Sequence, residues 1–320
     1  MERLAAPLGG LAVLYFAAST LASLAATLMS VWAVAALGLA AFGITHVIIE
    51  LRYVIGRFSS MLRGAFAWWL FGLTSLVFVA RALASIVPVA AVLEIVAGMA
   101  TVALGCWVAL GGAWRLLALL VCAAATIHAI EWPGQYFFVL THLHNLVPLA
   151  FLWDWSRRLG TSQRRYFLGM QLLWAVLIPL GLLLAAPSVE SVPGWLDARA
   201  AYSIWAGATP PGLRESGLTS YLSVFAFMQT MHYAVWIGFL PWAARDASAA
   251  FSARVPLLKG GRVWWLAAGC ALVLAGMYCL DYLAGRSVYG LLATYHVYVE
   301  LPLIVVLAAG CATRRAGGPH

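Results

Sequence analysis

Histidine and glutamate residues recur together at helical spacing inside apolar stretches of this chain. Three pairs stand three or four residues apart: His46 with Glu50, His128 with Glu131, and His296 with Glu300. Residues at this spacing lie on one face of a helix. A carboxylate one turn from an imidazole can bind one ring nitrogen and leave the other aimed at a metal ion. The pattern indicates metal ligation, although each pair alone also fits a hydrogen-bonded contact between two helices.

Two further histidine motifs extend this set. Gln229 precedes His232 by three residues in QTMHY, and His142 and His144 stand two apart in HLHNLVP. Side chains two apart point to nearly opposite sides of a helix, so we expect at most one of this pair to face the site. It would serve there as a fifth ligand, a proton relay or a substrate contact. Pro148 ends the motif and predicts local unwinding.

The composition identifies the elements that must position these groups. Of the 320 residues, 64% are hydrophobic and only 9% are charged, and the mean hydropathy is +0.93. Soluble domains carry about 25% charged residues. The chain is therefore expected to be an all-α, polytopic integral membrane protein. The net charge of +8 has no clustered basic face, which argues against a nucleic-acid partner.

Ten apolar segments are long enough to cross a bilayer, which takes about 20 residues. They are 6–26, 31–54, 65–84, 88–111, 115–131, 136–156, 166–186, 218–243, 263–284 and 288–311. Their length and uniform hydrophobicity favour helices over the strands of a membrane barrel. The sequence therefore predicts one bundle of about ten helices, a single domain over residues 1–320.

The basic residues predict how the bundle is oriented. With the N-terminus inside, fifteen of the 19 Lys and Arg residues fall on the cytoplasmic side, as the positive-inside rule requires. Both termini and the loops 55–64, 157–165 and 244–262 are then cytoplasmic. The long segment 187–217 is extracytoplasmic, and its tryptophans suit an interfacial helix, a lid or a simple connector.

Imidazoles from separate spans can meet at one ion. His46, His128, His232 and His296 come from the second, fifth, eighth and tenth spans, and we expect them to bind a divalent metal, with His142 or His144 added. Glu50, Glu131, Glu300 and Gln229 are expected to support these ligands. Non-haem Fe(II) is the expected ion, while haem, copper and zinc stay open. A di-metal desaturase-type site is disfavoured because HxxxH and HxxHH boxes are absent.

These motifs resemble the Brp/Blh family of membrane-embedded β-carotene dioxygenases. THVIIE, IHAIE and YHVYVE resemble its histidines followed by an acid, and QTMHY offers one histidine where the family has a pair. The resemblance implies an all-helical enzyme that uses four histidines and ferrous iron to cleave a lipophilic alkene with O₂. It thus implies an oxygenase acting on a carotenoid, isoprenoid or long-chain lipid.

Two other function classes fit the same residues. The chain is similar to haem A synthase in having membrane histidines on several helices, but here the acid follows the histidine. Intramembrane His and Glu residues also build proton-coupled transporters, which would bind no metal. In each case we expect a multi-pass protein of a prokaryotic cytoplasmic (inner) membrane, in contact with membrane lipids.

Overall fold

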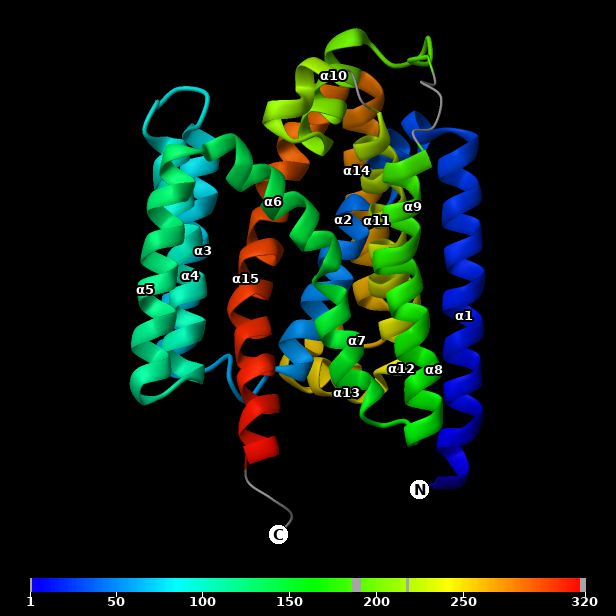
Figure 1. Ribbon diagram of the computed structural model, residues 1–320, viewed down its shortest axis with the longest axis vertical. Coiled ribbons are helices and arrows are strands. Elements are labelled where there is room, and N and C mark those ends of the chain that lie inside the picture. Colours follow the sequence, from blue (N-terminus) through cyan, green and yellow to red (C-terminus); the bar gives the residue numbers. More distant parts are fainter. Residues whose placement is uncertain (1, 186–190, 217–218, 317–320) are drawn as a thin grey trace.

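A computed structural model describes residues 2–185, 191–216 and 219–316, with side chains described for 9–185, 191–214 and 219–310. This part of the chain is a bundle of helices, and none of its residues lies in a strand (Figure 1). Ten helical segments are long and apolar enough to span a membrane. The chain is therefore a multi-pass, all-α membrane protein, as the sequence predicts.

Seven spans are single helices and three are interrupted. The single ones are α1 Glu2–Met29, α2 Val31–Arg57, α3 Gly64–Leu83, α4 Ala90–Ala109, α5 Gly112–Glu131, α14 Arg262–Leu280 and α15 Tyr282–Ala316. The interrupted ones are α6 Pro133–Leu146 with α7 Pro148–Ser156, α8 Thr161–Leu172 with η1 Leu173–Leu177 and α9 Ile178–Ala185, and α11 Ser220–Tyr233 with η3 Ala234–Phe239 and α12 Leu240–Ala243.

Local signals in the sequence separate the spans. The Ser30 side chain accepts a hydrogen bond from the Ala33 N–H at 3.4 Å, which caps α2 and divides it from α1. Gly64 and Gly112 have φ angles of 55° and 54°, and each is the first residue of a helix after a tight turn. Glycine adopts this left-handed conformation without a steric penalty. Tight turns at these glycines therefore separate α3 and α5 from the helices before them.

The interruptions in the spans have different forms. Helix α6 ends at Leu146 and α7 begins at Pro148, so Val147 alone separates them. The predicted break at this proline is therefore present. The segments η1 and η3 are π-helical turns within otherwise α-helical spans. Such turns are frequent at functional sites. The segment η3 begins two residues after His232.

Helix packing separates the bundle into a central and a peripheral part (Figure 1). The span Ser220–Ala243 is the most buried of the ten, whereas Gly112–Glu131 is the least buried. Helices α3, α4 and α5 pack in sequence on one side, and α15 joins this group to the rest through its contacts with α3, α4, α14 and α2. The centre of the protein therefore lies where α2, α11 and α15 meet α6.

The two ends of the bundle differ. The start of α1 and the end of α15 lie on the same side, together with the short helix α13 Arg245–Arg254 (Figure 1). Helix α10 Ala198–Ala208 lies at the opposite end and buries Ala200 and Ile204 against Trp32 and Leu222. The 187–217 segment therefore contains a helix packed over the bundle. It continues with the 3₁₀ turn η2 Pro211–Ser216, and a second such turn, η4 Pro256–Leu258, precedes α14.

Candidate metal centre

Four histidines from four spans meet in the middle of the bundle. They are His46 of α2, His144 of α6, His232 of α11 and His296 of α15. The Nε2 atom of His296 lies 3.2 Å from Nε2 of His46 and 3.1 Å from Nε2 of His144. The His232 ring lies 4.5 Å from the His144 ring and 5.0 Å from the His46 ring, measured between centroids. The imidazoles thus form one cluster, within which His46, His144 and His232 make one group able to hold an ion.

The spacing of the ring nitrogens matches that of ligands around one ion. Metal–nitrogen bonds of about 2.0–2.1 Å meeting at tetrahedral or right angles place neighbouring nitrogens roughly 3.0–3.4 Å apart. The two measured separations, 3.1 and 3.2 Å, fall inside this range. His46, His232 and His296 are buried, with exposed fractions of 1%, 1% and 0%. A small cation would therefore be held away from bulk water.

Hydrogen bonding on the far side of the rings leaves lone pairs facing the cluster. Nδ1 of His46 donates to the Phe42 carbonyl oxygen at 3.3 Å, and Nδ1 of His144 donates to Oε2 of Glu300 at 2.8 Å. A neutral imidazole carries one N–H, so the Nε2 atoms of these two histidines are acceptors. Nε2 of His296 can donate to only one of them. A cation between the rings would satisfy all three nitrogens at once.

His232 completes the cluster with no close hydrogen bond to either ring nitrogen in the described part of the chain. Its side chain is nevertheless buried. Buried polar groups are almost always paired, and an unpaired one calls for a missing ligand or ion. The position of His232 against the His46 and His144 rings makes a shared cation the natural partner.

Two glutamates form the other wall of the cluster. Glu50 and Glu300 both have an exposed fraction of 0%, and their carboxyl groups lie close enough to interact. Oε2 of Glu50 is 4.0 Å from Nε2 of His296, and His46, Glu50 and His296 form a second group able to hold an ion. The centre therefore offers imidazole nitrogens together with carboxylate oxygens.

The carboxylates pair differently from the sequence-based expectation. Each was expected to orient the histidine one turn earlier on its own helix. Instead, Glu300 of α15 bonds His144 of α6, while His46 is oriented by a backbone carbonyl. Glu50 lies beside the ligand nitrogen of His296 rather than behind His46. The supporting contacts therefore run between helices.

His128 and Glu131 lie outside this centre. Both are exposed on α5, the outermost span, and His128 lines a separate apolar cavity of about 480 Å³ between α4, α5, α6 and α15. His144 lies in the cluster where His128 was expected. Helix α5 packs mainly against α4 and α6 at the edge of the bundle, so His128 and Glu131 lie away from the other histidines.

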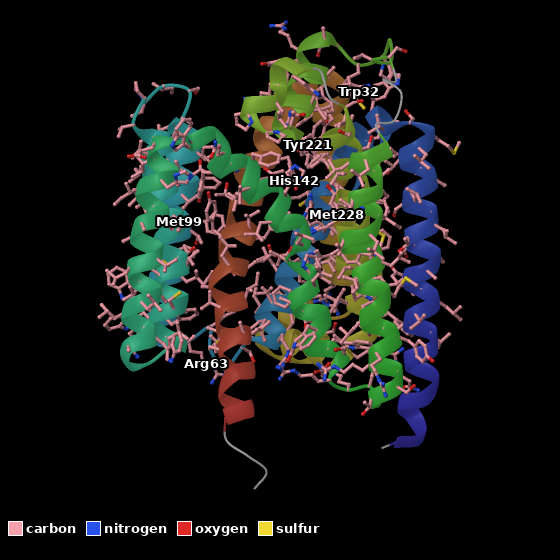
Figure 2. The ribbon with its side chains drawn as sticks, in the orientation of Figure 1. Trp32, Arg63, Met99, His142, Tyr221 and Met228 are labelled. Carbon is pink, nitrogen blue, oxygen red and sulfur yellow. The ribbon has the colours of Figure 1, made fainter. Side chains whose placement is uncertain are left out.

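His142 is also separate from the cluster. Its Nε2–H donates to the Ala208 carbonyl oxygen of α10 at 2.9 Å, and its ring packs 4.5 Å from that of Phe138. Figure 2 places His142 with Tyr221 toward the end of the bundle that carries α10. As expected for residues two apart, only His144 of this pair faces the centre.

A cavity of about 300 Å³ opens onto the four-histidine centre. Leu140, Phe225 and Val297 contribute apolar surface to it, and Gln229 lies beside Tyr233 in its wall. Its other end is lined by Arg81 and Arg286. Neither arginine was identified from the sequence as part of a site. One feature of the sequence could have identified Arg286. It lies at helical spacing from Tyr289, Ala293 and Val297, on a helix face that leads toward His296.

Comparisons of the chain with protein-family models, with curated proteins and with solved structures found no match.

Proposed function

We propose that this protein is a membrane-embedded, non-haem iron oxygenase that acts on a lipophilic substrate within a prokaryotic cytoplasmic membrane. The observation that carries the proposal is the position of the His296 Nε2 atom, 3.2 Å from Nε2 of His46 and 3.1 Å from Nε2 of His144 in the centre of the bundle. Charged or ionisable groups at membrane depth are costly and usually functional. His232 is the fourth proposed ligand.

The donor set suits ferrous iron. Imidazole binds iron, copper, zinc and nickel, while carboxylate oxygen favours harder ions, and sites with two histidines and one carboxylate are typical of oxygen-activating Fe(II). His46, Glu50 and His296 offer such a set beside the other two imidazoles. Bound iron would supply the activation of O₂. A dioxygenase reaction places both oxygen atoms in the products, so it needs no external reductant.

The protein's own residues have distinct parts in this proposal. Glu300 fixes the ring orientation of His144 and keeps its Nε2 lone pair directed at the ion. The buried carboxyl pair of Glu50 and Glu300 can hold a proton beside the ligands. Leu140, Phe225 and Val297 exclude water from the cavity and provide apolar contacts for a hydrocarbon chain.

The substrate class follows from the cavity and from the sequence resemblance together. An apolar cavity inside the bilayer suits a molecule that enters from the lipid. The Brp/Blh-like motifs around His46, His232 and His296 support an oxygenase reaction on an isoprenoid or similar chain. The IHAIE motif of the same resemblance contains His128, which lies outside the centre, so this motif gives the proposal no support.

Haem fits the geometry less well than a single ion. A haem with two axial histidines places its macrocycle between the two ligand nitrogens, which are then about 4 Å apart across the ring plane. The nitrogens here are 3.1–3.2 Å apart, and four rings approach from different sides.

A proton-coupled transporter is the second candidate. The specific observation in its favour is the buried pair of Glu50 and Glu300, because carboxyl groups at membrane depth commonly relay protons. In a transporter the imidazoles would carry protons and would bind no metal. Stoichiometric metal content therefore distinguishes the two functions.

The test is elemental analysis and an absorption spectrum of the detergent-purified protein. We expect about one iron per chain and no Soret band, as for mononuclear imidazole ligation. A protein that is folded but carries no transition metal, even after reconstitution with Fe(II) under anaerobic conditions, would refute the oxygenase and favour the transporter. A Soret band would favour haem.

A further inference from the structure

Arg286 brings a positive charge into the wall of the cavity without a matching carboxylate. Within the described residues, three arginines pair with an acid: Arg57 with Asp154, Arg81 with Glu94, and Arg158 with Asp246. Arg286 forms no ion pair in this part of the chain, and its Nη1–H donates to the Ser203 hydroxyl of α10. A cation inside a membrane protein normally pairs with an anion.

The other arginine in the cavity shows the contrast. Both terminal nitrogens of Arg81 are engaged, one with Glu94 and the other with the Gly290 carbonyl oxygen at 3.1 Å. Glu94 is held further by the Tyr298 hydroxyl at 3.1 Å. Arg81 is thus neutralised and fixed in the wall. The charge of Arg286 remains available to a molecule in the cavity.

The groups around Arg286 are hydrogen-bond donors. The buried hydroxyls of Tyr278 and Tyr282 have no hydrogen-bond partner within the described residues, and both lie close enough to act on the charge of Arg286. Gly207 of α10 faces the guanidinium, and a side chain there would lie 2.9 Å from one of its nitrogens. The absence of a side chain at Gly207 lets the guanidinium pack close to α10. The unpaired cation and the unpaired tyrosine hydroxyls together suit an anion.

The cavity links this end to the metal centre. Arg286 and His296 are ten residues apart on α15, which corresponds to about 15 Å along a helix. Ala293 and Val297 lie along the same wall, and Leu140 and Phe225 face them from α6 and α11. An extended chain advances roughly 1.2 Å per bond, so about a dozen bonds cover this distance. A long-chain amphiphile has both a polar end to bind Arg286 and a chain long enough to reach the histidines.

We propose that Arg286 binds the anionic headgroup, a carboxylate or a phosphate, of a single-chain amphiphile whose hydrocarbon chain extends toward the four histidines. A guanidinium binds either group through two parallel hydrogen bonds. The role of this molecule as substrate rests on the proposed oxygenase function. Its binding at Arg286 does not, because the headgroup lies away from the metal ligands.

Binding of three probes with the same chain length tests the proposal. The probes are hexadecanoate, hexadecyl phosphate and the neutral hexadecanol, applied in radiolabelled form to the full-length protein in lipid nanodiscs. We expect the protein to prefer at least one anion over the alcohol by about tenfold, the value of one charged hydrogen bond of roughly 1.4 kcal/mol. Which anion binds more tightly distinguishes a carboxylate head from a phosphate head.

Variants identify the residue responsible. Arg286→Gln should lower affinity for the preferred anion about tenfold, to the level of the alcohol, and leave alcohol binding unchanged. Unchanged alcohol binding also shows that the variant folds. Arg286→Lys keeps the charge and should retain most of the preference. The matched control is Arg199→Gln, which removes an exposed charge from α10 outside the cavity and should have no effect.

The outcomes separate this proposal from the oxygenase. Equal binding of anions and alcohol by the unaltered protein, or anion binding unaffected by Arg286→Gln, would overturn the headgroup site. His232→Ala removes a metal ligand and should leave the dependence on Arg286 in place. Anion binding through Arg286 in a protein that takes up no metal would retain the headgroup site and reject the oxygenase.

Discussion

Glu300 of α15 and His144 of α6 form a 2.8 Å hydrogen bond across the centre of the bundle. The bond joins two spans that are 156 residues apart in the sequence, and Nε2 of the same His144 lies 3.1 Å from Nε2 of His296, one turn before Glu300 on α15. The contact that orients one proposed ligand thus also fixes α6 against the helix that carries another. This relationship makes the metal centre and the packing of α6 interdependent.

Removal of His144 should abolish stoichiometric metal binding, because its Nε2 is one of the closely spaced ring nitrogens. We expect His144→Ala to contain well under half the iron of the unaltered protein by elemental analysis. His142→Ala is the matched control on the same helix, and His128→Ala is a second control on α5. Both should keep full metal content. Metal loss in His128→Ala with retention in His144→Ala would reverse the proposed ligand assignment.

Removal of the Glu300 carboxylate should weaken metal binding without abolishing it. Loss of a group that orients a ligating histidine typically lowers metal affinity 10- to 100-fold. We expect a loss of about this size for Glu300→Ala, measured by competition with a chelator of known affinity. Glu131→Ala removes an exposed carboxylate from α5 and should leave the affinity unchanged. An unaltered affinity in Glu300→Ala would show that the 2.8 Å bond does not support the centre.

Removal of only one partner of the ion pair between Arg81 and Glu94 should destabilise the protein strongly. Glu94 is buried, with an exposed fraction of 3%, and its removal leaves the guanidinium without a counter-charge. Loss of one partner of a buried pair costs about 3–5 kcal/mol, whereas apolar replacement of both is often near neutral. We expect Glu94→Leu to lower the thermal unfolding midpoint in detergent more than the double variant Arg81→Met with Glu94→Leu. A double variant whose unfolding midpoint is lower than that of Glu94→Leu would contradict this prediction.

Gly105 allows α4 to approach the backbone of α15 closely. A Cβ atom at this position would lie 2.6 Å from the Pro302 Cα atom, which belongs to the backbone and cannot rotate away. Insertion of a side chain into such packing costs about 1–3 kcal/mol. Gly105→Ala should therefore lower the unfolding midpoint. Gly276→Ala, where no atom lies within 4 Å, is the control and should be neutral or slightly stabilising.

The ten spans could be predicted from the sequence because their signal is simple. Runs of about 20 apolar residues separated by glycine, proline or arginine define membrane helices almost without competition. The observed span Val31–Arg57 overlaps the predicted segment 31–54, and Arg262–Leu280 overlaps 263–284. The break before Pro148 was also predicted. These features depend on local chemistry alone.

The histidine cluster could be predicted only in part, for a reason specific to membranes. His46, His232 and His296 lie together as expected, and His144, expected as an added ligand, lies with them, whereas His128 lies apart. In a soluble helix, polar residues mark the outward face. In a bilayer, both the lipid-facing and the buried faces are apolar, so the sequence does not reveal which way His128 points. The sequence does not reveal that Glu94 pairs with Arg81 either, because the two residues lie on different helices.

The π-helical turn η3 has a consequence for how this protein tolerates insertions and deletions. A π turn holds one residue more than an α turn. Deletion of a single residue within 234–239 would restore regular α-helix while His232 before the turn and Leu240 beyond it kept their faces. Deletion of a residue from a regular α-helical stretch would instead rotate the flanking halves relative to each other by about 100°. The π turn thus reconciles two helical registers, one set by the histidine cluster and one by the packing below it.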